Sequence, residues 1–265
     1  MTATTSIAET GVAILLLGQS GCRVDAGGVR LYLDPYLSNS VAELDGADLE
    51  RLVPIAFPPD RVNDADWVLI THAHIDHCDP QTLPALAAAS PGARLVGPLP
   101  VVQRLRDWGI DPGRIILATE QWTDLAPKVR LHAVPAAHPV IARDDGGHLE
   151  CVGYVLEVQQ RRIYFAGDTS LTAELLQALH GLSPIAVALL PVNEPNYFRA
   201  RRGIIGNMSV REAFGLAAEI GVQRVVPVHW DMFAANGVQR DEIAAVYREF
   251  QTEFELLLGS SELRL

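Results

Sequence analysis

A short run of histidine and aspartate residues is the part of the sequence best suited to chemistry. The run is His72-x-His74-x-Asp76-His77, and it follows an apolar segment, Trp67–Thr71, that we expect to be a strand. Residues i and i+2 of an extended chain point the same way, so His72 and His74 can reach one metal ion. After a turn, Asp76 and His77 can face a second position. Imidazole and carboxylate ligands suit zinc, iron or manganese. The alternative is a surface loop with clustered histidines.

Three further residues of metal-binding type follow predicted strands later in the chain. They are His138, Asp168 and His229, which come after the expected strands Lys128–Pro135, Arg161–Ala166 and Arg224–Val228. Functional residues gather at the carboxyl ends of strands in α/β proteins, so these three can meet the first cluster. Taken singly, each is also compatible with a structural role in the core or at a helix cap.

The elements around these residues indicate sheet packed on sheet with helices outside. Val12–Leu17 and Val29–Asp34 are expected to form a hairpin that turns at Gly27-Gly28. Residues 35–60 form a long connection of low periodicity, and such connections often cover a site. A capping box predicts a helix over Ser209–Ile220. No linker of distinct composition divides the chain, so we expect a single domain over all 265 residues.

The acidic composition excludes some classes of partner. The formal net charge is −11, and such a surface repels phosphate backbones, so we expect no nucleic-acid partner. Three cysteines are too few for a disulfide framework and fit a reducing cytosol. The first ten residues are polar and lack a basic segment, and the apolar run Val12–Leu17 is too short to span a bilayer. We therefore expect a cytoplasmic protein with no membrane partner.

The order of these motifs resembles that of the metallo-β-lactamase superfamily, with an HxHxDH run, a separate histidine, a Gly-Asp pair and a final histidine. Within this superfamily the chain is similar to the UlaG-like branch, the relatives of L-ascorbate-6-phosphate lactonase. The segments that carry the closer similarity are Asp34-Pro35, Thr71–His77, Gly167–Thr169, Arg202–Ser209 and Val226–Asp231. The resemblance spans most of the chain.

The resemblance implies an α/β fold of the metallo-β-lactamase type, an αββα four-layer sandwich with the site at one edge between the sheets. The ligand sets that it implies are His72, His74 and His138 for a first metal ion, Asp76, His77 and His229 for a second, and Asp168 as a bridge between them. The implied cofactors are one or two divalent metal ions, and zinc and manganese are the expected metals.

Catalysis in such a site would use hydroxide, because a divalent cation lowers the pKa of bound water towards about 7. Asp76 is the candidate to orient that water or to hand a proton to the leaving group. Arg202 has the planar fork that suits a phosphate or carboxylate, and Asn193 lies in the segment that leads to it. The alternative for Arg202 is a solvated surface charge. Asp231 can either orient a metal-bound imidazole or cap a helix.

Three functions are compatible with these residues. The first is a metal-dependent hydrolase that opens a small anionic lactone or ester. The second is a metal-dependent phosphodiesterase acting on a cyclic nucleotide or phospholipid, which needs the same metals. The third is a non-catalytic metal-binding scaffold, against which the complete ligand set argues. The sequence leaves open the substrate, the metal and the oligomeric state, including a homo-oligomer.

Overall fold

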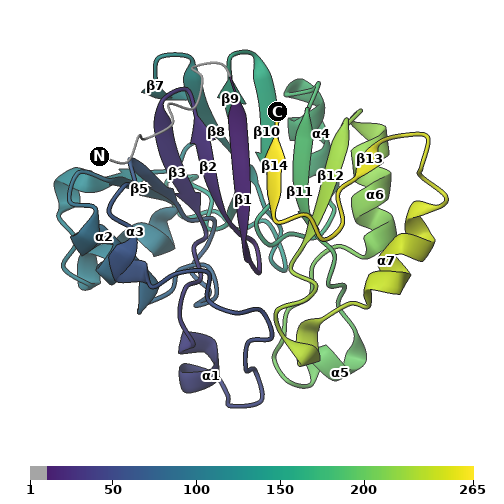
Figure 1. Ribbon diagram of the computed structural model, residues 1–265, viewed down its shortest axis with the longest axis horizontal. Helices are drawn as coiled ribbons and strands as arrows, with labels where there is room; N and C mark the ends of the chain where they lie inside the picture. The colour runs from purple at the N-terminus through teal and green to yellow at the C-terminus, as the bar shows by residue number, and fades with distance from the viewer. Residues whose placement is uncertain (1–10) are drawn as a thin grey trace, which may run out of the picture.

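Two mixed β-sheets lie face to face in the centre of the molecule (Figure 1). The structure is a computed structural model that describes residues 11–265, and the expectation about the first ten residues lies outside this range. The first sheet has the strand order β14 (Glu262–Arg264), β1 (Val12–Gly18), β2 (Gly21–Ala26), β3 (Val29–Leu33), β4 (Trp67–Leu69), β5 (Arg94–Gly97), β6 (Ile115–Leu117). The second has the order β13 (Glu255–Leu256), β12 (Arg224–Val228), β11 (Val187–Pro191), β10 (Arg161–Phe165), β9 (Val152–Val158), β8 (Val129–Pro135), β7 (Thr123–Ala126).

Both sheets combine antiparallel pairs with a run of parallel strands. In the first sheet, β14, β1, β2 and β3 pair antiparallel, while β4, β5 and β6 continue in parallel from β3. In the second sheet, β7 to β10 pair antiparallel, while β11, β12 and β13 continue in parallel from β10. The parallel strands of each sheet end at a common edge, where the loops that follow them can meet.

The alternation of buried side chains explains why both faces of each sheet are covered. In β3, Leu31 and Leu33 belong to the apolar core between the sheets, whereas Tyr32 packs in the cluster under the helices. Successive side chains of a strand point to opposite faces, so such a strand needs a covering layer on each side. In β11, Leu189 and Leu190 divide in the same way between the central core and a helix-side cluster.

Helices form the two outer layers. The helices are α1 (Ser40–Leu44), α2 (Thr82–Ala89), α3 (Leu99–Asp107), α4 (Ala173–Gly181), α5 (Tyr197–Ala200), α6 (Val210–Glu219) and α7 (Arg240–Tyr247), with short 3-10 turns η1 (Pro59–Arg61), η2 (Pro112–Arg114) and η3 (Ala234–Asn236). Figure 1 shows α2 and α3 outside the first sheet, and α4, α6 and α7 outside the second. The αββα sandwich expected from the sequence is therefore confirmed.

The short helices α1 and α5 lie at the same end of the sandwich (Figure 1). α1 follows the carboxyl end of β3, and α5 follows the carboxyl end of β11. Both therefore belong to the edge where the parallel strands end. No helix within residues 11–265 is long and apolar enough to cross a membrane.

The structure tests two local predictions, a hairpin near the start of the chain and a capping box at Ser209. The hairpin predicted between Val12–Leu17 and Val29–Asp34 is wrong in its pairing, because β2 lies between them and pairs with both β1 and β3. The polar and glycine residues around β2 hid a strand whose side chains are mostly buried. The capping box at Ser209 is confirmed, with the Ser209 side chain accepting from the Glu212 backbone N–H and the Glu212 carboxylate accepting from that of Ser209.

Candidate metal centre

The segment after β4 makes the turn that brings its histidines together. The strand ends at Leu69, and the backbone N–H groups of His77 and Cys78 both donate to the His74 carbonyl oxygen, at 3.1 and 2.7 Å. This turn folds the chain back within a few residues. His72 and His77 are consequently buried side by side, with ring centroids 4.2 Å apart.

Three histidines form the first group of close ligand atoms. His72 Nε2 lies 3.0 Å from His74 Nδ1, which lies 3.1 Å from His138 Nε2. His138 follows the end of β8, so this group joins the two sheets. Burial lowers the pKa of His72 well below its ordinary value and that of His138 to about 4. Both rings are therefore neutral at physiological pH, which is the form that binds a metal ion.

The second group combines a carboxylate with two histidines. Asp76 Oδ2 lies 3.5 Å from His77 Nε2 and 3.4 Å from His229 Nε2. His229 follows the end of β12 in the second sheet. Although burial alone would raise the pKa of Asp76, the neighbouring His77 and His229 hold it well below its ordinary value. Asp76 is therefore ionised in this setting.

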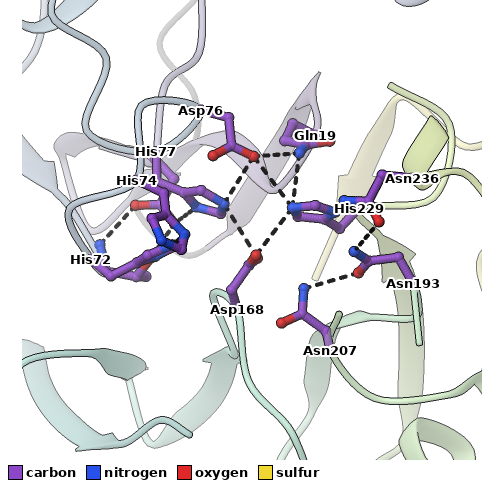
Figure 2. A network of polar contacts seen from close by, with 12 residues as sticks. Gln19, His72, His74, Asp76, His77, Asp168, Asn193, Asn207, His229 and Asn236 are labelled. Carbon is purple, nitrogen blue, oxygen red and sulfur yellow. Dashed lines mark hydrogen bonds and ion pairs between the residues drawn. The ribbon is translucent and has the colours of Figure 1, made fainter. Parts of the chain in front are cut away.

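Asp168 lies between the two groups (Figure 2). One of its carboxylate oxygens is 3.2 Å from His77 Nε2, and the other is 3.1 Å from His229 Nε2 and 3.6 Å from His138 Nε2. Burial acts to lower the pKa values of His77 and His229, but the adjacent carboxylates raise the first well above its ordinary value and the second to about 9. The carboxylates of this site therefore require positive charge beside them.

The donor set fits one or two divalent cations. His77 Nε2 and Asp168 Oδ1 are completely buried and face each other, yet neither makes a hydrogen bond within residues 11–265. Buried polar atoms without a partner are rare and demand an explanation. Within each of the two groups, and within a third formed by His72, His77 and Asp168, the ligand atoms lie within 4.8 Å of one another. Imidazole and carboxylate groups arranged in this way match the ligands of zinc, manganese or iron.

Asp34 and Gln19 hold this cluster in place. Asp34 Oδ2 accepts a hydrogen bond from His77 Nδ1 at 2.8 Å, so the other ring nitrogen of His77 points at Asp76 and Asp168. Gln19 Nε2 donates to Asp76 Oδ2 at 2.6 Å and lies 2.8 Å from His229 Nε2. Sequence reasoning missed both roles. The only signals were the Asp34-Pro35 pair and the glycine-flanked turn that contains Gln19.

Backbone strain is concentrated at the same place. Gln19, Asp34 and His229 have φ values of 55°, 40° and 61°, and they are three of the six non-glycine residues with positive φ among residues 11–265. Such conformations cost about 1–3 kcal/mol each and persist where surrounding contacts over-determine them. Gln19 and Asp34 contact the cluster and His229 belongs to it. The strained backbone at these residues therefore places their side chains at the site.

A cavity of about 470 Å³ opens above the cluster, a volume suited to a small molecule. His74, Asp76, His138, Asp168 and His229 form part of its wall. The connection over residues 35–60 contributes Val41, Asp45 and Leu49, as expected of a covering segment, and the loop after α5 contributes Arg202 to Ile205.

The predicted substrate contacts occupy different places. Arg202 lines the cavity, and its partly exposed guanidinium pairs with Asp48 of the covering connection. Asn193 is fully buried behind the wall, where its amide donates to Asn236 Oδ1 at 3.1 Å and accepts from Asn207 at 2.9 Å (Figure 2). Asn236 itself lines the cavity, and no motif or spacing in the sequence singles it out.

Asp231 lies beside a separate hollow rather than in the wall of the site cavity. That hollow is also lined by Gln19 and Trp230. Burial raises the pKa of the Asp231 carboxyl. Gln19, Asp76 and Asp168 all contact His229 Nε2, and the orienting role considered for Asp231 stays a prediction.

The fold and the site together define an αββα sandwich protein with a histidine–aspartate cluster at one edge of its sheets. The family model described as the beta-lactamase superfamily domain matches residues 29–230, which is most of the chain. The chain therefore belongs to the β-lactamase superfamily.

Several curated proteins are similar in sequence to this chain. An uncharacterized protein of Mycobacterium tuberculosis is 26% identical over 84% of this chain, which spans only 59% of that relative's length. A metal-dependent hydrolase of Pyrobaculum aerophilum is 27% identical, with coverage of 82% of this chain and 83% of the relative. The N-acyl-phosphatidylethanolamine-hydrolyzing phospholipase D 1 of Caenorhabditis elegans is 23% identical over 85% of this chain and 65% of its own length.

Solved structures show the same fold. A metallo hydrolase from the archaeon Ignicoccus hospitalis superimposes with a TM-score of 0.68 at 23% sequence identity, covering 97% of this chain and 99% of that structure. At this level of identity the similarity establishes the architecture.

Proposed function

We propose that this chain is a metal-dependent hydrolase that opens a small anionic lactone or ester, in the manner expected of the UlaG-like branch. The observation that supports it is the convergence of seven histidine and aspartate side chains, five of which form part of the wall of one cavity, with buried ligand atoms that lack hydrogen bonds. The hydrolase name of the Pyrobaculum relative points in the same direction.

The proposed ligand sets follow the two groups described above. His72, His74 and His138 would hold one ion, Asp76, His77 and His229 a second, and Asp168 would contact both. A divalent cation in this position would lower the pKa of bound water and would act as a Lewis acid on the oxygen under attack. Zinc and manganese both accept such ligands.

Asp76 is the proposed proton-handling group. Its carboxylate lines the cavity, is held ionised by His77 and His229, and is fixed by the Gln19 amide. An ionised carboxylate in this position can orient a water molecule, accept its proton and return the proton to the leaving oxygen. Gln19 limits the rotation of the Asp76 carboxylate by donating to its Oδ2.

Arg202 is a proposed contact for the anionic group of the substrate. It lines the cavity, and its present partner Asp48 has a side chain that is 68% exposed. Exposed ion pairs contribute little stability, so a substrate anion can replace Asp48 at small cost. Asn193 would act on the substrate indirectly, by fixing the Asn236 amide in the cavity wall.

A phosphodiesterase acting on a phospholipid or cyclic nucleotide is the second candidate. The Caenorhabditis elegans phospholipase supports it, because that relative shares 23% identity over most of this chain. Turnover of bis(4-nitrophenyl) phosphate without turnover of lactones or carboxylic esters would favour it. The reverse pattern would favour the lactone or ester hydrolase.

The proposal is tested by metal analysis and turnover of three variants. Protein purified without chelators should hold divalent metal and hydrolyse members of a lactone and ester panel. His74→Ala and Asp168→Ala should each lose most of the metal and the turnover, because each removes a ligand atom from a shared cluster. His180→Ala is the matched control, since His180 is exposed and pairs with Glu219 away from the cluster. Unchanged metal content and turnover in the first two variants would refute the proposal.

A further inference from the structure

We propose that Arg104 forms an anion-binding subsite in the wall of the site cavity and selects substrates that bear a carboxylate or phosphate group. That the bound anion belongs to a substrate rests on the proposed function. The subsite itself rests on the position of Arg104, its lack of a partner and the charge of its surroundings.

Arg104 is one of two arginines that line the cavity. The other, Arg202, pairs with Asp48. The guanidinium of Arg104 makes no hydrogen bond, ion pair or ring contact with any residue of the range 11–265. An arginine fork offers five N–H donors, and a pair of them matches one carboxylate or phosphate. Arg104 therefore keeps its full capacity to bind an anion, whereas Arg202 must first exchange a partner.

The helix that carries Arg104 is firmly anchored. Val101 and Leu105 of α3 are fully buried in the cluster that packs α2 and α3 on the first sheet. Cys78, next to the metal ligand His77, belongs to the same cluster. The cluster therefore ties the helix that carries Arg104 to the segment that holds His77.

The charges of the cavity wall explain why such a group is needed. Asp45, Asp76 and Asp168 are the acidic residues of the lining, in a chain with a formal net charge of −11. Asp76 and Asp168 belong to the proposed ligand sets, so Asp45 is the lining carboxylate whose charge no bound metal would balance, and it would repel an anionic substrate. Arg104 lines the same cavity as His74 and Asp76 and supplies a fixed positive charge at its wall.

The other residues of the cavity wall indicate the chemical character of the rest of the ligand. Ile75, Ile204, Ile205 and Phe233 contribute apolar surface to the same cavity. A compound that fits has a compact apolar body or ring, with an anionic group at one end for Arg104 and a hydrolysable carbonyl directed at the metal centre. Carboxylated and phosphorylated lactones or esters belong to this class.

The subsite is tested by direct binding of a compound that cannot be hydrolysed. Glutarate is titrated by calorimetry into the metal-loaded chain and into Arg104→Gln, Arg104→Lys and Arg106→Gln. Arg106 lies on the same helix and is exposed, as Arg104 is, but it is not part of the cavity wall, so Arg106→Gln controls for the loss of one charge. We expect glutarate binding to weaken about ten- to hundredfold in Arg104→Gln, because a hydrogen-bonded charge is lost. Arg104→Lys should be intermediate, and Arg106→Gln should match the wild type.

Turnover then separates this proposal from the hydrolase proposal. The two probes are 5-oxotetrahydrofuran-2-carboxylate and its neutral counterpart γ-valerolactone. In Arg104→Gln, KM should rise for the carboxylated lactone alone. Arg104-dependent glutarate binding without hydrolysis of any lactone or ester would refute the hydrolase and leave the subsite standing. Equal glutarate binding by Arg104→Gln and the wild type, or no binding by either, overturns the subsite even where hydrolysis is observed.

Discussion

Asp34 shows how a residue outside the ligand cluster can fix one of its members. Its carboxylate accepts hydrogen bonds from the backbone N–H and hydroxyl of Thr71, at 2.8 and 2.6 Å, and from His77 Nδ1 at 2.8 Å. The first two contacts fix the carboxylate, and the third fixes the imidazole. The direction of His77 Nε2 is therefore decided by a residue 43 positions earlier in the chain.

Asp34→Asn should weaken metal binding about 10–100-fold, because the substituted amide no longer supplies the charge that orients His77 and strengthens it as a ligand. Metal affinity is measured by competition with a chromophoric chelator. Asp107→Asn serves as the control, since Asp107 is an exposed residue at the end of α3. Equal metal affinity in Asp34→Asn and the control would contradict the orienting role.

At the scale of elements, the strand-to-loop junctions determine the geometry of the site. The ligands follow β4, β8, β10 and β12, whose carboxyl ends lie at one edge of the sandwich. The junction after β10 is especially tight. Gly167 has a φ of +60°, and a Cβ at this position would lie 2.7 Å from the Thr71 Cβ. Thr71 in turn holds Asp34, so this glycine permits the two sheets to approach at the ligands.

Gly167→Ala should destabilise the fold by about 1–3 kcal/mol more than a glycine substitution that adds backbone strain alone, because the new methyl group must displace Thr71. Gly109→Ala is the matched control, since Gly109 has a φ of +76° with nothing within 4 Å of its built Cβ. Urea unfolding gives both free energies. Equal losses of stability in the two variants would show that contact with Thr71 has no role.

Across the whole molecule, the candidate metal centre joins the two sheets. His72, His74, Asp76 and His77 come from the first sheet, whereas His138, Asp168 and His229 come from the second. Bound metal would therefore cross-link halves that otherwise meet through the apolar core between the sheets. Ligands that bind only the folded state stabilise it by mass action.

Removal of metal with a chelator should lower the melting temperature by roughly 5–10 °C when the free metal had exceeded its Kd about a hundredfold. The comparison is made by calorimetry before and after chelation. Asp168→Ala should show little difference between the two conditions, because its cluster lacks the residue that contacts both ligand groups. A wild-type melting temperature that does not respond to chelation would contradict the cross-linking role.

The sequence revealed the parts of the site that depend on local spacing. His72 and His74 are two residues apart, so they point the same way in an extended segment. His138, Asp168 and His229 each follow a predicted strand, and functional residues gather at such strand ends. Contacts between distant positions could not be predicted from the sequence. Examples are the contacts of Gln19 with Asp76 and His229, which are 57 and 210 residues away. Pattern and propensity describe neighbours along the chain, whereas such contacts depend on the packing of whole sheets.

The same limit applies to surface arginines and to short strands. Arg104 and Arg106 look alike in the sequence, and only the placement of α3 against the cavity distinguishes them. The strand β2 was missed although Cys22, Val24 and Ala26, which belong to the core between the sheets, alternate with Arg23 and Asp25. The segment is only six residues long and begins with a glycine, so its period is a weak signal.

The pairing of β14 with β1 affects the order in which the molecule assembles. Ile14 lies opposite Leu263 in an antiparallel ladder, so the outer strand of the first sheet comes from the far end of the sequence. During synthesis, β1 emerges long before β14, and until then its outward backbone groups form an uncovered sheet edge. The growing chain therefore passes through a stage in which its amino-terminal half can recruit a strand from another molecule. Chaperones that shield nascent chains would have a defined edge to protect.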